Sequence, residues 1–305
     1  MTLIVGASIG ISKYPDHGNS LDILLRAADI AMYESKKIQN HAQIFQDSLQ
    51  DEYLKHVKIE HELRKAIEHH ELFVVYQPQI DHTGSIHGVE ALARWESATL
   101  GIVPPDQFIP VAEASGQMVK IGYFILSRTL QEIQTTLGIT FQTSINISVR
   151  QFMEADFLEQ FLNAIHDIGM NKDLITIEIT ENLFIEDVDY ILPLLHKIQQ
   201  CGIQISMDDF GTGYSSLNML RKLPIDELKI DKSFIDTIVE DKTAQKMVQN
   251  IIAIGKNFNM SVLAEGVETN EQIALLTSFG CDKFQGYYFA KPLPKDDLIT
   301  FFQKR

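Results

Sequence analysis

The sequence predicts an α/β fold: a (β/α)8 barrel of the TIM type, preceded by a small α/β segment and a connector helix. From about residue 71 onward, short apolar segments alternate with amphipathic helical patterns, and eight strand candidates fit into the rest of the 305 residues. Polar residues also recur near the carboxyl ends of these strands. In a barrel of parallel strands, such positions converge on one mouth, where active sites lie.

Composition narrows the classes of function. The chain is 45% hydrophobic and 22% charged, which suits a packed core and excludes a disordered type. Its net charge of −15 argues against binding a nucleic acid duplex or a broad anionic membrane face. We expect no membrane contact within this chain, because it has no apolar run of about 18 residues and no signal-peptide pattern. Any membrane anchor of a full-length protein would lie outside it.

The two cysteines, Cys201 and Cys281, are far apart and lack CxxC spacing. Reduced structural thiols are the better interpretation, and they suit a cytoplasmic protein.

Residues 1–46 predict a strand over Leu3–Ile11 and an amphipathic helix. Apolar residues recur at helical spacing from Leu21 to Ala28, and Ser20 is placed as the N-cap. One strand with one or two helices cannot close a core, so this segment is expected to end a larger domain or to pack on the rest. Residues 47–70 predict a charged connector helix, either solvated or part of a dimerising stalk.

The pattern of strands and helices in residues 71–305 predicts the barrel. A doubly wound open sheet is the alternative, but the Gly-rich phosphate turn after its first strand is missing. The link Asp81–His87 between the first two strand candidates is too short for a helical crossover, so these strands should pair antiparallel. The predicted strands are Leu72–Tyr76, Gly88–Leu92, Thr143–Ile147, Ile175–Ile179, Ile203–Met207, Glu227–Ile230, Ser261–Ala264 and Phe284–Phe289. The clearest helical patterns are Arg150–Ile168, Val188–Gln200, Ala244–Phe258 and Asn270–Phe279.

The most informative strand end is the acid pair Asp208-Asp209, which follows an apolar alternation and precedes a glycine-rich turn, Phe210–Gly213. Adjacent carboxylates repel each other unless a cation or proton lies between them. Polar side chains interrupt the other strands near their ends in the same way: Glu90, Asn146, Glu178, Lys229, Glu265 and Gln285. Any one of them alone could be a buried polar group with its hydrogen bonds made, or part of an ion pair at the edge of the barrel.

Together these residues predict a metal centre. Five acids against one lysine are too negative to bury without cations. Oxygen ligands without cysteine or histidine favour Mg²⁺ or Mn²⁺ over Zn²⁺, and Asn146 adds a neutral oxygen. Two ions that share Asp208 would lie about 4 Å apart, the spacing for in-line displacement at phosphorus. Lys229 could orient the attacking water or stabilise developing negative charge. A Schiff-base lysine at this position is a further alternative.

The chain from about 71 to 305 resembles the EAL-domain cyclic di-GMP phosphodiesterases. The resemblance is carried by Tyr76-Gln77-Pro78-Gln79-Ile80, Glu90-Ala91-Leu92, Asp208–Leu217, Leu228–Asp231, Ala264–Glu268 and Gln285-Gly286-Tyr287. It implies a Mg²⁺- or Mn²⁺-dependent hydrolase that uses two ions, is inhibited by Ca²⁺ and opens cyclic di-GMP to linear 5′-pGpG. The alternative is a catalytically silent cyclic di-GMP receptor.

The resemblance also implies a role for each residue. Glu90, Asn146, Glu178 and Asp208 would bind the first metal, Asp208 and Asp209 the second, and Glu265 would act with Lys229 on the water, in part through that metal. Arg94, Gln77, Gln285 and Leu92 would contact the substrate. Glu181 and Glu268 would position the loop after the acid pair.

Residues 1–46 resemble the end of a GGDEF domain, through Ala7–Ile11 and Ala27–Tyr33 with Lys36. The GGDEF active-site motif is not present, so this segment is not expected to make cyclic di-GMP. The connector helix beside this segment is the one feature that suggests a homodimer.

Overall fold

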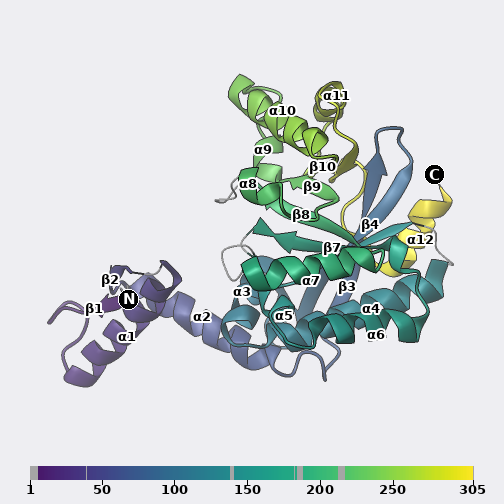
Figure 1. Ribbon diagram of the computed structural model, residues 1–305. Helices are drawn as coiled ribbons and strands as arrows, with labels where there is room; N and C mark the ends of the chain where they lie inside the picture. The colour runs from purple at the N-terminus through teal and green to yellow at the C-terminus, as the bar shows by residue number, and fades with distance from the viewer. Residues whose placement is uncertain are drawn as a thin grey trace. The chain divides into compact units, whose positions relative to one another are not determined.

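The computed structural model describes residues 6–38, 40–137, 141–181, 183, 188–211 and 217–304. The chain divides into two compact units, Met1–Ala66 and Ile67–Arg305 (Figure 1). No helix among the described residues is both long and apolar enough to cross a membrane.

The first unit holds a parallel pair of short strands, β1 (Ile9–Ile11) and β2 (Ala42–Ile44), and the helix α1 (Leu21–Ile38). The helix lies close to β1 because Gly10 has no side chain; a Cβ there would lie 1.9 Å from the carbonyl oxygen of Ala28.

Three details of the first unit bear on the sequence predictions. Of the strand expected over Leu3–Ile11, only Ile9–Ile11 is a strand, and the first part of that range lies outside the described residues. The Ser20 hydroxyl accepts a hydrogen bond from the Ile23 N–H at 3.4 Å, in the manner of an N-cap. The predicted connector helix is shorter than expected: α2 spans Asp47–Leu63, and a turn follows it up to His70, whose φ is +57°.

The second unit is the predicted barrel. Within its described residues, eight strands close in the order β3, β11, β10, β9, β8, β7, β6, β4, and β3 pairs with β4 to complete the ring. The strand β3 runs antiparallel to both of its neighbours, which confirms the antiparallel first strand, and all other neighbours in the ring are parallel. The strands are β3 (Leu72–Asp81), β4 (Ile86–Ser97), β6 (Gln142–Asn146), β7 (Ile175–Thr180), β8 (Gln204–Phe210), β9 (Glu227–Ile230), β10 (Ser261–Ala264) and β11 (Lys283–Gln285).

Helices surround these strands (Figure 1). They are α3 (Pro105–Ala114), α4 (Met118–Leu137), α5 (Val149–Phe152), α6 (Phe157–Ile168), α7 (Val188–Gln200), α8 (Leu217–Leu220), α9 (Lys232–Ile235), α10 (Lys242–Asn257), α11 (Asn270–Ser278) and α12 (Lys295–Gln303), with a short 3-10 turn, η1 (Lys172–Leu174).

Several features differ from the sequence predictions. The first two strands are longer than expected, since β3 continues to Asp81 and β4 to Ser97. The single helix expected over Arg150–Ile168 is two helices, because α5 ends at Phe152 and a turn precedes α6. The last strand ends at Gln285 rather than at Phe289. An additional short strand, β5 (Gly101–Val103), pairs antiparallel with the far end of β4.

The barrel strands are apolar on one face and polar on the other. Ile145, Ile177 and Ile205 are almost fully buried, and they alternate along β6, β7 and β8 with polar residues that bond to each other across neighbouring strands. Because successive side chains of a strand point to opposite faces, the polar set fills the barrel interior. This polar interior positions the site.

Candidate metal centre

Lys229 on β9 is fully buried and lies at the centre of the acidic residues. Its Nζ is 2.7 Å from Glu265 Oε1 and 2.8 Å from Glu178 Oε2. The same nitrogen is 3.3 Å from Asp208 Oδ1 and 3.7 Å from Glu90 Oε1. The four carboxylates come from β4, β7, β8 and the residue after β10, so the structure brings these strand ends together.

Two side-chain amides orient Glu90. Asn146 Nδ2, at the end of β6, donates to Glu90 Oε1 at 2.8 Å. Gln285 Nε2 on β11 donates to Glu90 Oε2 at 2.5 Å and to Gln77 Oε1 at 3.1 Å. Burial works to raise the pKa of Glu90, but Lys229 and these two amides hold it below its usual value. Glu90 is therefore an ionised carboxylate with a fixed orientation.

The pKa values of the other acids show that the single positive charge of Lys229 does not neutralise the negative charge of the cluster. Burial and the neighbouring Glu90 raise the pKa of Glu178 well above its usual range. Burial raises the pKa of Glu265 to about 8, and burial with the adjacent Asp208 raises that of Asp209 to about 6. Lys229 is buried, which works to lower its pKa, but the surrounding carboxylates raise it well above its ordinary value, so it stays charged. Without further cations, Glu178 and Glu265 favour their protonated forms at neutral pH.

The donor set fits divalent cations. Asp208, Asp209 and Glu265 each offer a carboxylate oxygen, and these oxygens lie within 4.8 Å of one another. Glu178 Oε1 is buried and has no hydrogen-bond partner among the described residues, which is costly for a carboxylate oxygen. A cation would satisfy that oxygen, and an all-oxygen donor set is the type that hard divalent ions prefer.

Two cavities flank the cluster, and Glu90, Leu92 and Asp208 line both. The cavity on the side of α3 and α4 measures about 370 Å³ and also has Arg94 and apolar residues such as Phe108 in its wall. The other cavity measures about 310 Å³ and is lined in addition by Lys232, Gln77 and Gln285 among others. A ligand with two similar halves could thus extend to both sides of the metal centre.

Residues 60–292, which include most of the second unit, match the EAL domain. This chain belongs to the EAL domain family.

Curated relatives match over nearly the whole chain. The bifunctional diguanylate cyclase/cyclic di-GMP phosphodiesterase MucR of Pseudomonas aeruginosa is 36% identical over 301 residues, which cover 97% of this chain and 44% of MucR. The cyclic di-GMP phosphodiesterase PdeR of Escherichia coli is 34% identical over 290 residues, 94% of this chain and 44% of PdeR. The chain thus spans less than half the length of these relatives.

Solved structures show the same barrel. The structure of a phosphodiesterase called PaMucR in complex with c-di-GMP has a TM-score of 0.76 at 37% identity and covers 79% of this chain and 99% of that one. A calcium/cy-diGMP complex of BlrP1 from Klebsiella pneumoniae has a TM-score of 0.66 at 25% identity, covering 74% of this chain and 56% of that one.

Of the remaining predicted site residues of this EAL domain, Arg94 and Glu268 line the two cavities, and Glu181 directly follows β7. Arg94 is half-buried, and it donates from Nη1 to the Ala93 carbonyl at 2.7 Å; burial lowers its pKa. Glu181 is buried, whereas Glu268 is exposed and pairs with Lys232 at 2.6 Å. Thr212–Ser216, in the loop that Glu181 and Glu268 are predicted to position, fall outside the described residues.

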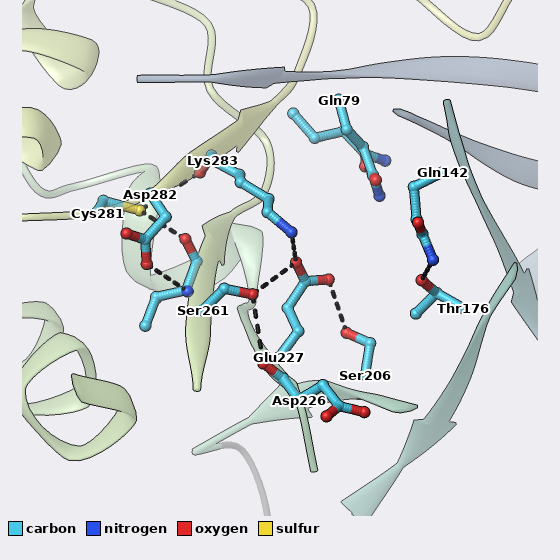
Figure 2. A network of polar contacts seen from close by, with 12 residues as sticks. Gln79, Gln142, Thr176, Ser206, Asp226, Glu227, Ser261, Cys281, Asp282 and Lys283 are labelled. Carbon is cyan, nitrogen blue, oxygen red and sulfur yellow. Dashed lines mark hydrogen bonds and ion pairs between the residues drawn. The ribbon is translucent and has the colours of Figure 1, made fainter. Parts of the chain in front are cut away.

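A second polar layer of the EAL barrel was missed by the sequence reasoning (Figure 2). At the amino ends of the parallel strands, the Glu227 carboxylate accepts from Ser206 at 3.0 Å and from Ser261 at 3.2 Å, and Lys283 Nζ lies 2.7 Å from it. Each of Ser206, Glu227 and Lys283 stands two positions before a residue of the metal centre. The alternation of the strands could have revealed this layer, since residues i and i+2 share a face.

Proposed function

We propose that this chain is a cyclic di-GMP phosphodiesterase that hydrolyses cyclic di-GMP to linear 5′-pGpG. The observation that carries the proposal is the cluster of four acids around the buried Lys229, with Asp209 next to Asp208 and Glu265 and with cavities on both sides. Cyclic di-GMP has two equivalent halves, which match two cavities that share a wall. The family membership and the names of MucR and PdeR support the same substrate.

The cofactors that we propose are two divalent cations, Mg²⁺ or Mn²⁺. Glu90, Asn146, Glu178 and Asp208 would hold one of them, and Asp208, Asp209 and Glu265 the other. When bound, such cations lower the pKa of water and neutralise charge on phosphoryl oxygens. We propose that Ca²⁺ inhibits, because it accepts the same oxygen ligands but with longer, more variable geometry.

The protein's own side chains would bind the substrate and stabilise charge. Lys229 Nζ is held in place by carboxylates and cannot reorient freely, so its charge is preorganised for the negative charge that develops at phosphorus. The remaining N–H groups of Arg94 can donate to a phosphate that enters the larger cavity. Leu92, in the wall between the cavities, can contact both halves of the ligand.

The test is hydrolysis of cyclic di-GMP in Mg²⁺ or Mn²⁺ buffer, followed by chromatography of the products. Glu90→Ala should abolish formation of 5′-pGpG, whereas Glu159→Ala on the exposed side of α6 should leave it unchanged. Wild-type protein that binds the ligand but returns it intact would indicate a receptor. Turnover that persists in EDTA would contradict metal catalysis.

We further propose that residues 1–46 are the end of a GGDEF domain, that residues 47–70 connect it to the catalytic unit, and that the protein is a cytoplasmic homodimer. Light scattering of the purified chain tests the dimer, and cell fractionation tests the location. A monomer at micromolar concentration would contradict the dimer.

A further inference from the structure

Two buried glutamines of the antiparallel strand β3 lie beside the metal centre. Gln77 and Gln79 are two residues apart and therefore share the inner face of the barrel. The strand register places Gln77 opposite Glu90 on β4, and Gln79 opposite Gln285 on β11. All four side chains are at least nine-tenths buried: Gln77 is 8% exposed, Gln79 1%, Glu90 4% and Gln285 4%.

Three of these side chains form a chain of hydrogen bonds with one direction, and the fourth, Gln77, accepts a second bond from Gln285 Nε2 at 3.1 Å. Gln79 Nε2 donates to Gln285 Oε1 at 3.0 Å, and Gln285 Nε2 donates in turn to Glu90 Oε2 at 2.5 Å. An ionised carboxylate can only accept, so the amide nitrogen of Gln285 must face Glu90. The amide oxygen of Gln285 then faces Gln79, which must supply an N–H.

We propose that Gln79 is a positioning residue of the metal centre, because its N–H fixes the amide of Gln285 in the orientation that holds the metal-ligating carboxylate of Glu90. The inference deepens the proposed metal site and rests on it. Gln79 itself contacts neither the cluster around Lys229 nor the wall of either cavity within the described residues. Its effect is therefore exerted through Gln285.

The expected size follows from the behaviour of residues that support metal ligands. Removing a hydrogen-bond partner behind a ligand typically weakens metal affinity by about 10- to 100-fold. Gln79→Glu keeps the shape but turns the donor into an acceptor, so Gln285 Nε2 would turn toward residue 79 and away from Glu90. Gln79→Met removes the donor without adding charge and leaves Gln285 Oε1 unpaired.

A purely structural role for Gln79 would be to fill the barrel seam between β3 and β11. Gln142 provides a matched control, because it is also a buried barrel glutamine, but its amide donates to Thr176 at 2.8 Å rather than toward Glu90 (Figure 2). Gln142→Met therefore removes one buried amide hydrogen bond without touching Glu90 or Gln285.

The experiment measures Mn²⁺ binding by electron paramagnetic resonance of the free ion, without substrate, on the full chain. Near-ultraviolet circular dichroism and the metal-free melting temperature are recorded for each variant. We expect the Kd for Mn²⁺ to rise by about 10- to 100-fold in Gln79→Glu and Gln79→Met, and by less than about 3-fold in Gln142→Met. The midpoint of Mn²⁺ activation should shift by the same factor.

Wild-type affinity in Gln79→Met, or an equal loss in Gln142→Met, would overturn the inference. If cyclic di-GMP is not the substrate, the experiment gives a different result. If the wild type binds Mn²⁺ but does not hydrolyse cyclic di-GMP, the shift in Mn²⁺ affinity still supports or refutes the role of Gln79.

Discussion

Removal of divalent cations should make the stability of the barrel fall as the pH rises. In the cation-free protein, burial raises the pKa of Glu265 to about 8 and that of Glu178 well above its usual value. Between the unfolded pKa of about 4.5 and these folded values, the folded state binds more protons than the unfolded state. The free energy of unfolding therefore decreases with rising pH in that window.

The magnitude follows from the linkage relation. For each such carboxyl, the free energy of unfolding falls by about 1.4 kcal/mol per pH unit. For a barrel of this size, that loss corresponds to a fall in Tm of roughly 3–6 °C. The interval from pH 6.5 to 7.5 lies between the ordinary carboxyl pKa and the pKa of Glu265. Burial lowers the pKa of His87, so in this interval the unfolded state binds more protons at His87 than the folded state does. His87 by itself would therefore make Tm rise with pH, and it does not cause the expected fall.

The assay is differential scanning fluorimetry at pH 6.5, 7.0 and 7.5, in EDTA and in 10 mM MgCl₂. The fall in Tm should occur in EDTA and should disappear or reverse in Mg²⁺, since the cation competes with the protons. In EDTA, Glu265→Gln should reduce the slope of Tm against pH by the contribution of one carboxyl group. A Tm that stays constant or rises with pH in EDTA would refute this account of the cluster's electrostatics.

Other substitutions test separate parts of the structure. Lys229→Met should lower kcat for cyclic di-GMP by at least about 100-fold at saturating Mg²⁺, because it removes preorganised charge; near-wild-type kcat would contradict this role. Phe161→Ala, in the fully buried ring pair with Phe157, should cost about 3–5 kcal/mol in urea unfolding while the Kd for Mn²⁺ stays the same. Native protein at pH 8 should show one thiol reactive toward a disulfide reagent, the half-buried Cys201, because burial raises the pKa of Cys281 to about 12; two rapidly reacting thiols would contradict this.

The residues around Lys229 could be predicted because they rest on local patterns. A single acid such as Glu90 or Glu178 interrupts an apolar strand, and this is visible within five residues of sequence. The barrel topology then requires that the carboxyl ends of the strands converge. The antiparallel pairing of β3 with β4 followed from one short link, and the structure confirms it.

Other features depend on which segments become neighbours in space. The bond between Gln79 and Gln285 joins residues 206 positions apart, and nothing near either glutamine indicates its partner. The break between α5 and α6 is hidden for a related reason: Phe152 and Phe157 continue the apolar pattern across the turn, and their rings pack 5.0 Å apart.

The seam between β3 and β11 also bears on when the site forms during folding. β3 and β4 are joined by a short turn and can pair early, whereas β11 must return to β3 over 206 residues. Closing a loop of that length costs roughly 5 kcal/mol of chain entropy, so this contact is expected late. A chain folded only as far as β10 holds the carboxylates but lacks Gln285. Divalent cations should therefore act on the last step, by holding closed a ring that has just formed, and should slow its reopening more than they speed its assembly.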